Sequence, residues 1–410
     1  MAGLYLHIPF CEKKCIYCSF YSIETFEARD RFLDGIVREI DMRADMLEQE
    51  GKAPEEYETI FFGGGTPSLL SPEEIGRIFA ALRRRFVVAD GAEITMECNP
   101  GALTHEWLEG YRDLGVNRIS FGVQSFHDDE LRFLTRIHTA DEARRSIQLA
   151  RSIFENVSLD LIFALPGQTE ERWRSNLLEG LRLGTEHISA YSLIFEEGTR
   201  LNAMRLAGDV QPADESIDAD MYEETMRTVA GYGLEQYEVS NYARPGRECR
   251  HNIGYWERRS YLAFGPSAHG FLRSPEASVR WGNLSNLSAY LDAIAKGNLP
   301  VASREVLTPE LMMEEIIFLG IRSSGIILPE FSAVAGAELT DLAGAEIGLI
   351  VDGGYGRIEN QRLTMTRKGY PFADRFALQL INAVERKLPQ SASPRRIMPN
   401  LPVINATMRG

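Results

Sequence analysis

"HIPFCEKKCIYCSFYS", residues 7–22, contains three of the five cysteines of the chain, Cys11, Cys15 and Cys18. A structural zinc site needs four protein ligands, usually from two cysteine pairs far apart in the sequence, and the other two cysteines here stand alone. An iron–sulfur cluster fits the loop better, because cubane clusters take thiolates from compact loops. Four thiolates are the usual number, so three leave one iron of the cluster without a protein ligand. That iron is open for chemistry, like the free coordination position of a catalytic zinc ion.

The composition and the charge exclude several classes of protein. The 410 residues are too many for one ordinary hydrophobic core, so about two or three domains are expected. A formal net charge of −15 argues against nucleic acid or an anionic membrane as the main partner, since both reward a basic surface. No apolar run approaches the roughly 18 residues of a membrane span, and the N-terminal "MAGLYLHIPF" lacks the features of a signal peptide. With too few cysteines for a disulfide framework, the sequence predicts a cytoplasmic protein.

Six apolar, β-rich runs divide the first half of the chain, and segments with helical period lie between them. Residues 29–47 repeat apolar side chains at helical spacing, and residues 71–86 open with Ser71 as an N-cap and Glu74 three positions later. Such alternation predicts a parallel sheet with helices outside. Six units suit an incomplete barrel that is open on one side for a large substrate, so the predicted fold class is α/β, a partial (β/α)6 barrel. The six runs are residues 3–10, 57–67, 93–100, 118–125, 157–169 and 187–199.

Polar or glycine-rich turns follow the predicted strands. In parallel barrels, sites assemble at the carboxyl ends of the strands. The glycine turn "GGGTP", residues 63–67, follows the second run, Glu97 and Gln124 end the third and fourth, and Arg136 comes later in the loop after the fourth. Asp160 lies within the fifth run, where a carboxylate is costly to bury unless a ribose hydroxyl or Arg136 pairs with it.

The cysteine spacing and these strand ends together resemble the radical S-adenosylmethionine (SAM) superfamily, whose fold is a partial (β/α)6 barrel. In that superfamily the fourth iron chelates the amino and carboxylate groups of SAM, and an aromatic residue before the last cysteine packs on the adenine. The resemblance implies two cofactors, SAM and a [4Fe–4S] cluster held by Cys11, Cys15 and Cys18. It also implies the SAM-binding residues, which are Tyr5, Tyr17, Gly64, Gly65, Thr66, Glu97, Gln124, Arg136 and Asp160.

Longer motifs narrow the resemblance to the oxygen-independent coproporphyrinogen III oxidase family. "YLHIPFC", "GGGTP", "FGVQS" and "DLIFALPGQT" carry it, and it covers about residues 3 to 385. The family has two branches, the dehydrogenase of porphyrin biosynthesis and a group of haem chaperones. The dehydrogenase has a further cysteine where this chain has Phe20, and a long N-terminal extension where only ten residues precede Cys11. "HNIGYW", residues 251–256, and "AFGPSAHGF", residues 263–271, are similar to the haem-chaperone group.

His251 in the HNIGYW motif has two interpretations. Histidine is a common axial haem ligand and aromatic rings flank a flat macrocycle well, so the resemblance implies a haem-linked role. A packed structural histidine is the other interpretation, and the residues alone favour it. Cys249 is close enough in sequence to be a thiolate haem ligand instead, and Cys98 lies beside Glu97, but each is more often an ordinary buried thiol.

The chain divides into four predicted parts. They are a radical SAM barrel (1–235), a family-specific extension with the HNIGYW motif (236–308), a smaller α+β C-terminal domain with a winged-helix-like unit (309–388) and a disordered tail (389–410). Short strands are predicted in the extension at 237–246 and 278–284. Asp341 and Glu346 in the would-be recognition region of the C-terminal domain argue against DNA binding. The family resemblance implies that the C-terminal domain is a lid or docking module. The tail is rich in proline and small polar residues.

Two functions follow from the resemblance. The preferred one is a haem chaperone that binds haem and delivers it to acceptor haemoproteins, with the cluster and SAM in a structural or regulatory role or in support of transfer. The alternative is a radical enzyme that oxidatively decarboxylates coproporphyrinogen III, in which the cofactor carries the difficult step and the barrel excludes water. The implied partners are haem, acceptor haemoproteins, respiratory ones among them, and an electron donor for the cluster. A peripheral membrane contact, a monomer or homodimer state and the catalytic residues stay open.

Overall fold

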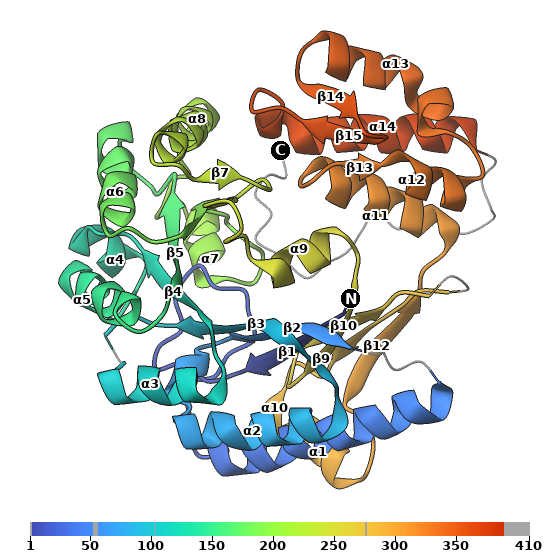
Figure 1. The fold of residues 1–410 in the computed structure, drawn as a ribbon. Coiled ribbons are helices and arrows are strands. Elements are labelled where there is room, and N and C mark those ends of the chain that lie inside the picture. Colours follow the sequence, from blue (N-terminus) through green and yellow to red (C-terminus); the bar gives the residue numbers. More distant parts are fainter. Residues whose placement is uncertain (1, 52–55, 102, 275–276, 389–410) are drawn as a thin grey trace.

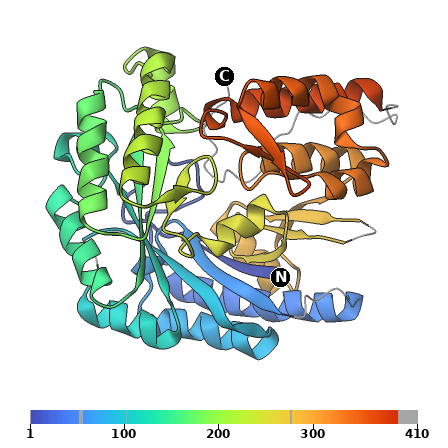
Figure 2. The same ribbon diagram turned by 45° about the horizontal axis from the view of Figure 1, so that its top comes forward.

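The computed structural model of the chain describes residues 2–51, 56–101, 103–274 and 277–388, so the disordered tail predicted for 389–410 lies outside the described residues. A 12-stranded sheet dominates the fold, in the order β12-β11-β10-β9-β1-β2-β3-β4-β5-β6-β8-β7. It curves around an interior, with helices on its outer side, and a smaller domain packs beside it (Figures 1 and 2). None of the described helices is long and apolar enough to cross a membrane.

The first six strands confirm the predicted partial (β/α)6 barrel. Each pairs in parallel with its neighbour in chain order. Because side chains alternate along a strand, one face of each strand meets the helices and the other faces the barrel interior. In β1, Leu4, Leu6 and Ile8 enter the apolar core and Tyr5 and His7 face inward. The strands are β1 (Ala2–Ile8), β2 (Tyr57–Gly64), β3 (Val88–Cys98), β4 (Arg118–Gln124), β5 (Asn156–Phe163) and β6 (His187–Ser192).

Several helices of the barrel begin at a serine or threonine whose side chain caps the first turn. Ser71 forms the predicted capping box with Glu74 at the start of α2, and Thr139 forms another with Glu142 at the start of α5. Apolar residues of α1 such as Phe32 and Ile36 are fully buried against the sheet. The elements are α1 (Arg29–Glu50), η1 (Pro67–Leu69), α2 (Pro72–Arg85), α3 (His105–Leu114), α4 (Asp128–Phe133), α5 (Ala140–Arg151), α6 (Glu170–Arg182), α7 (Arg200–Ala207) and α8 (Glu215–Gly231).

The segment 236–308 extends the barrel sheet at both edges and does not form a layer of its own. β8 pairs antiparallel with β6, whereas β9 pairs in parallel with β1 and begins an antiparallel run of further strands. The two predicted short strands contain β8 and β11. The elements are β7 (Glu235–Gln236), β8 (Asn241–Ala243), α9 (Arg250–Trp256), β9 (Ser260–Phe264), β10 (His269–Leu272), β11 (Val279–Asn283), α10 (Leu287–Ala295) and β12 (Val301–Val306).

The C-terminal domain has its own apolar core and the strand–helix order of a winged helix, as predicted. A three-stranded sheet in the order β13-β15-β14 packs with four helices. It sits above α9, which lies between it and the barrel sheet (Figure 1). Its elements are α11 (Pro309–Ile321), β13 (Ile326–Ile327), α12 (Leu328–Ala335), α13 (Leu339–Asp352), β14 (Gly356–Glu359), β15 (Arg362–Met365), η2 (Tyr370–Phe372) and α14 (Ala373–Lys387).

Specific contacts fix this domain on the barrel. The backbone N–H of Val239 donates to the carbonyl of Arg322 at 2.9 Å, and Trp256 of α9 packs in one apolar cluster with Val239 and Leu319. Arg280 of β11 pairs with the buried Glu315 of α11 at 2.7 Å. Apolar packing, a backbone hydrogen bond and an ion pair therefore hold the two parts together.

A buried carboxylate joins α1 to the added strands. Glu39, fully buried, accepts hydrogen bonds from the backbone N–H of Gly265 (2.8 Å), the Asn283 amide (2.7 Å) and the Tyr290 hydroxyl (2.6 Å). Arg43, one turn later, lies 3.8 Å from Glu39 and stacks over the ring of Trp281. Four donors or cations around one carboxylate offset the cost of burying it.

Replacing Glu39 with glutamine is expected to lower the free energy of unfolding by about 3–5 kcal/mol, because the new NH2 group faces a donor and Arg43 loses its counter-charge. Chemical denaturation of the purified protein measures this change. Asp41→Asn on the same helix is the matched control, since the ion pair of Asp41 with Arg84 is exposed and is expected to contribute less than about 1 kcal/mol. An equal loss of unfolding free energy in both variants would show that the buried Glu39 cluster contributes no more to stability than an exposed ion pair.

Candidate functional site

The cysteine loop leaves the carboxyl end of β1 and is fixed at both ends. The Cys11 N–H donates to the carbonyl of Ile23 at 2.9 Å, and the Ile23 N–H donates back to the carbonyl of Pro9 at 2.7 Å. The His7 imidazole bonds the carbonyl of Tyr21 through Nε2 at 2.8 Å, and the hydroxyl of Tyr21 accepts from the N–H of Leu287 at 2.7 Å. Inward residues of β1 and the start of α10 therefore set the position of the thiols.

The three thiols suit a cubane cluster better than a single metal ion. Cys11 is buried, whereas Cys15 and Cys18 are partly exposed. Burial raises the pKa of the Cys11 thiol, and it raises the pKa of Cys18 to about 12, with the charge of Cys15 adding to the rise. Within the described part of the chain, no three histidine, cysteine or acidic side chains are arranged to hold one metal ion. In a cubane each thiolate binds a different iron, so the donor set of one loop with three cysteines fits that group.

The glycine turn after β2 lies directly against the cysteine loop. The N–H groups of Gly65 and Thr66 donate to the carbonyls of Ile8 and Phe10, both at 2.8 Å. A Cβ at position 65 would lie 2.6 Å from the Phe10 oxygen and 3.1 Å from the Cys11 sulfur. Only glycine fits there. The sequence predicted that this turn approaches a ligand closely. In the structure the turn also packs closely against the cysteine loop.

Two carboxylates face the barrel interior beyond this turn. Burial, followed by the charge of the neighbouring Asp160, raises the pKa of Glu97 to about 8. Burial also raises the pKa of Asp160, which a hydrogen bond from Ser189 and the charge of Arg118 oppose. Arg136, the protein partner expected for Asp160, directs its hydrogen bonds elsewhere. Both carboxyl groups can therefore accept hydrogen bonds from the hydroxyl groups of a ligand.

Gln124 and Arg136 carry polar atoms that the protein does not satisfy. Gln124 adopts a positive φ of 71° at the end of β4, and its buried Oε1 has no partner among the described residues. The guanidinium of Arg136 donates to the Cys15 sulfur at 3.3 Å and to the Gly122 carbonyl at 2.6 Å, while its Nε has no partner there. Unsatisfied buried groups of this kind mark a place for a polar ligand or ordered water.

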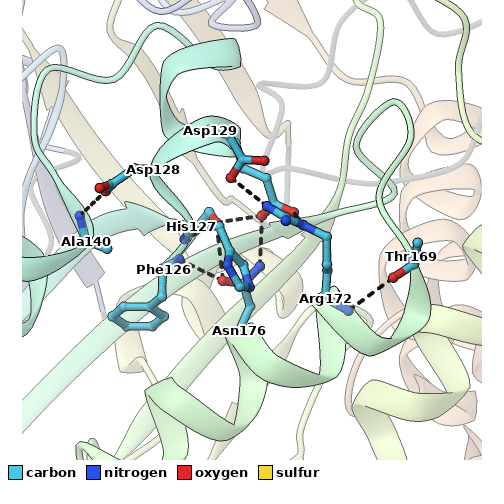
Figure 3. A network of polar contacts seen from close by, with 10 residues as sticks. Phe126, His127, Asp128, Asp129, Ala140, Thr169, Arg172 and Asn176 are labelled. Carbon is cyan, nitrogen blue, oxygen red and sulfur yellow. Dashed lines mark hydrogen bonds and ion pairs between the residues drawn. The ribbon is translucent and has the colours of Figure 1, made fainter.

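A buried network holds the backbone that follows Gln124 (Figure 3). The Oδ1 atom of Asn176, from α6, accepts from the N–H of Phe126 at 2.7 Å and from the Ser125 hydroxyl at 3.2 Å. Its Nδ2 donates to Glu130 at 2.9 Å, and Glu130 accepts from Arg172 at 3.0 Å. These bonds fix the sharp exit from β4 and, through it, the unusual backbone of Gln124.

Tyr5 and Tyr17 flank the same region. A Cβ at Gly63 would lie within 3.1 Å of both the Tyr5 ring and the Glu97 carboxylate, so these two side chains meet at the glycine turn. Tyr17 packs on the apolar cluster beneath the cysteine loop, and burial, followed by the charge of Cys15, raises its pKa. The structure therefore brings the predicted SAM residues and the three cysteines to one end of the barrel.

Asn99 belongs to this region, although the sequence reasoning missed it. It lies two residues after Glu97, so by strand alternation it faces the same side. Its amide donates to the Thr66 hydroxyl at 3.0 Å and accepts from Arg136 at 2.8 Å. Continuing the alternation of β3 past its last residue is the signal that would have found it.

His251 lies near the amino ends of β1 and β2, next to this site, because the Tyr5 ring stacks on its imidazole with 6.4 Å between centroids. Its ring nitrogens are both bonded, Nδ1 to Thr59 at 2.7 Å and Nε2 to the hydroxyl of Tyr255 at 2.9 Å. The ring stacks on Phe61 with 5.1 Å between centroids, and burial lowers its pKa to about 3. Cys249 is fully buried beside Glu93. A cavity of about 20 Å³ adjoins His251, far below the roughly 300–1,000 Å³ of ordinary ligand pockets.

Comparisons with known proteins agree with this geometry. The Radical SAM superfamily matches residues 5–177 and the HemN C-terminal domain matches residues 307–372. "Heme chaperone HemW" from Bacillus subtilis (strain 168) is 36% identical, covering 83% of this chain and 89% of that protein, and the protein of the same name from Lactococcus lactis is 35% identical, covering 92% and 98%.

The fold itself has been seen in a solved structure. Coproporphyrinogen III oxidase (HemN) from Escherichia coli, described as a radical SAM enzyme, superposes with a TM-score of 0.77 at 22% identity, covering 92% of this chain and 89% of that one. The partial barrel with its smaller C-terminal domain is therefore confirmed, and the HemW relatives confirm the resemblance to the haem-chaperone group. The chain belongs to the HemW family of the radical SAM superfamily.

Proposed function

We propose that this protein is a haem chaperone that binds haem and passes it to acceptor haemoproteins. The observation that carries the proposal is the similarity to proteins named heme chaperone HemW over 89% and 98% of their lengths. Phe20 supports it, because this residue stands where the related dehydrogenases have a further cysteine. Five free cysteines are in keeping with the cytoplasm as the proposed location.

The proposed cofactors are a [4Fe–4S] cluster and SAM, as membership of the superfamily implies. When bound together, they supply one-electron chemistry that protein side chains cannot. Cys11, Cys15 and Cys18 would hold the cluster, and the Gly64–Thr66 turn, Glu97 and Asp160 would position SAM. Gln124 and Arg136 support this assignment, since each has a buried polar atom that no described residue satisfies. Tyr5 and Tyr17 would close the site with their rings.

His251 and Cys249 are the candidate axial ligands for haem. Both are buried in the structure, so ligation by His251 requires its Nε2 to release the hydroxyl of Tyr255, or its Nδ1 to release Thr59. A local opening of α9 would free either residue. Acceptor haemoproteins and an electron donor for the cluster are the proposed partners, and no feature of the described residues assigns them individually.

The second candidate is an oxygen-independent coproporphyrinogen III dehydrogenase. The observation in its favour is the fold, which matches coproporphyrinogen III oxidase from Escherichia coli over 92% of this chain. A structural similarity at 22% identity supports the same fold but does not establish the same activity. The two functions therefore have to be separated by experiment.

Replacing Cys15 with alanine is expected to abolish the brown chromophore and the EPR signal of the reduced cluster after anaerobic reconstitution, because one iron loses its thiolate. Iron and sulfide analysis gives the stoichiometry. Cys98→Ala and Cys249→Ala are the matched controls and should retain nearly full iron, since both thiols are buried outside the cysteine loop, Cys98 at the end of β3 and Cys249 beside Glu93. A full cluster in Cys15→Ala would exclude this ligand set.

Replacing Asp160 with alanine is expected to weaken SAM binding by about 1.5–3 kcal/mol, the range for a hydrogen bond to a charged group. That loss corresponds to a roughly 10–150-fold higher Kd, which equilibrium dialysis against the reconstituted protein measures. Asp113→Ala is the control, because Asp113 lies on the exposed side of α3. An unchanged Kd in Asp160→Ala, with iron content intact, would remove Asp160 from the site.

Haem titration and coproporphyrinogen turnover, measured on one anaerobic preparation, test the function itself. A chaperone should bind haem near one to one with a Soret band and show no decarboxylation with SAM and a reductant. His251→Ala and Cys249→Ala should identify the ligand by weakening or reshaping the haem spectrum while the cluster stays intact. Thr59→Val is the control for His251, since it removes a hydrogen bond from the ring and leaves the imidazole. Turnover without haem binding would establish the dehydrogenase instead.

A further inference from the structure

One side-chain amide connects two of the three cluster cysteines. Asn99 donates through Nδ2 to the Thr66 hydroxyl at 3.0 Å, and that hydroxyl lies 3.6 Å from the Cys11 sulfur as its donor. On the other side, Asn99 Oδ1 accepts from Nη2 of Arg136 at 2.8 Å, and Nη1 of Arg136 donates to the Cys15 sulfur at 3.3 Å. A continuous path of four hydrogen bonds therefore runs from Cys11 to Cys15.

The chemistry of the groups gives this path a single direction. A guanidinium can only donate, so the oxygen of the Asn99 amide must face Arg136 and the nitrogen must face Thr66. The Thr66 oxygen then accepts from Asn99, which leaves its own proton free for the Cys11 sulfur. Thr66 is 3% exposed, so water does not compete for that proton. The orientation of the Asn99 amide thus determines which hydrogen bonds the Cys11 and Cys15 sulfurs accept.

The surroundings hold the amide in this orientation. The backbone N–H of Asn99 donates to the Ser68 hydroxyl at 3.3 Å, which ties the end of β3 to the helical turn after Thr66. Arg136 is further held by the carbonyl of Gly122 at 2.6 Å. A Cβ at Gly122 would approach the Arg136 guanidinium to 3.5 Å and Asn99 Oδ1 to 3.9 Å. The ends of β2, β3 and β4 therefore meet at Asn99.

We propose that Asn99 is a positioning residue that sets the reduction potential of the cluster, an inference that rests on the proposed [4Fe–4S] site. Hydrogen bonds to the sulfurs of an iron–sulfur cluster are one of the factors that set its potential. They favour the reduced state, which carries one more negative charge and so accepts hydrogen bonds more strongly. By orienting Thr66 and Arg136 together, Asn99 raises the potential and makes the cluster easier to reduce.

The test is an EPR-monitored redox titration of reconstituted protein without SAM, so that SAM binding does not enter the result. Asn99→Leu, neutral and of similar shape, is expected to lower the midpoint potential. A tenfold fall in the ratio of reduced to oxidised cluster at fixed ambient potential, about 59 mV for one electron, is the expected size. Thr66→Val is expected to lower it less, because Arg136 keeps its place. The double variant should match Asn99→Leu, because the Thr66 bond depends on the amide.

Asn117→Leu is the matched control. The Asn117 side-chain amide also forms two hydrogen bonds to β3: it accepts from the N–H of Ile94 and donates to the carbonyl of Ala92, both at 2.8 Å. Asn117 lies just before β4, at the amino end of that strand. The potential of Asn117→Leu should equal that of the wild type. An unchanged potential in Asn99→Leu with full iron, or additive shifts in the double variant, would overturn the inference. If Asn99→Leu loses its cluster, Thr66→Val decides, and an unchanged potential there also overturns it. A wild type that binds no cluster would instead refute the proposed [4Fe–4S] site and the inference together.

Discussion

The close packing of the glycine turn on the cysteine loop is the constraint on which the rest of the site depends. A Cβ at Gly65 would lie 2.6 Å from the Phe10 carbonyl oxygen and 3.1 Å from the Cys11 sulfur, so no side chain fits there. Because β1 and β2 are paired in register up to Gly64, the loop and the turn must leave the sheet side by side. Thr66, the next residue, is thereby brought to Cys11, and the polar groups at the ends of β3 and β4 gather around that contact.

Much of the barrel could be predicted from the sequence because its signals are local. The Ser71 capping box, the alternation of the strands and the spacing of the three cysteines all lie within short windows. The parts that could not be predicted depend on contacts between distant residues. Asn99 becomes part of the site only through Thr66 and Arg136, and the parallel pairing of β9 with β1 joins segments about 260 residues apart. No local pattern encodes the pairing of β9 with β1. The alternation of β3 gives the side to which Asn99 faces, but not its contacts with Thr66 and Arg136.

The HNIGYW helix shows the same limit in another way. The motif identified the family correctly, but the pattern left two interpretations of His251, and the structure places that ring in a packed position with both nitrogens bonded. At the other end of α9, Trp256 packs against the C-terminal domain. One short helix therefore contacts the barrel interior through its first turn and the neighbouring domain through its last. A movement of the C-terminal domain can therefore be transmitted through α9 to the barrel interior, and the reverse.

An open sheet also has a cost that a closed barrel avoids. Its two outermost strands expose unpaired backbone groups, to which a strand of another molecule can add. At one edge, β7 has only two residues, too few to act as a template. At the other, β12 carries Arg304 and Glu305, and Glu305 is paired with Arg280. The register of β12 with β11 also shifts near Asn283. Shortness on one side and charge on the other thus make each edge a poor template for the addition of a further strand.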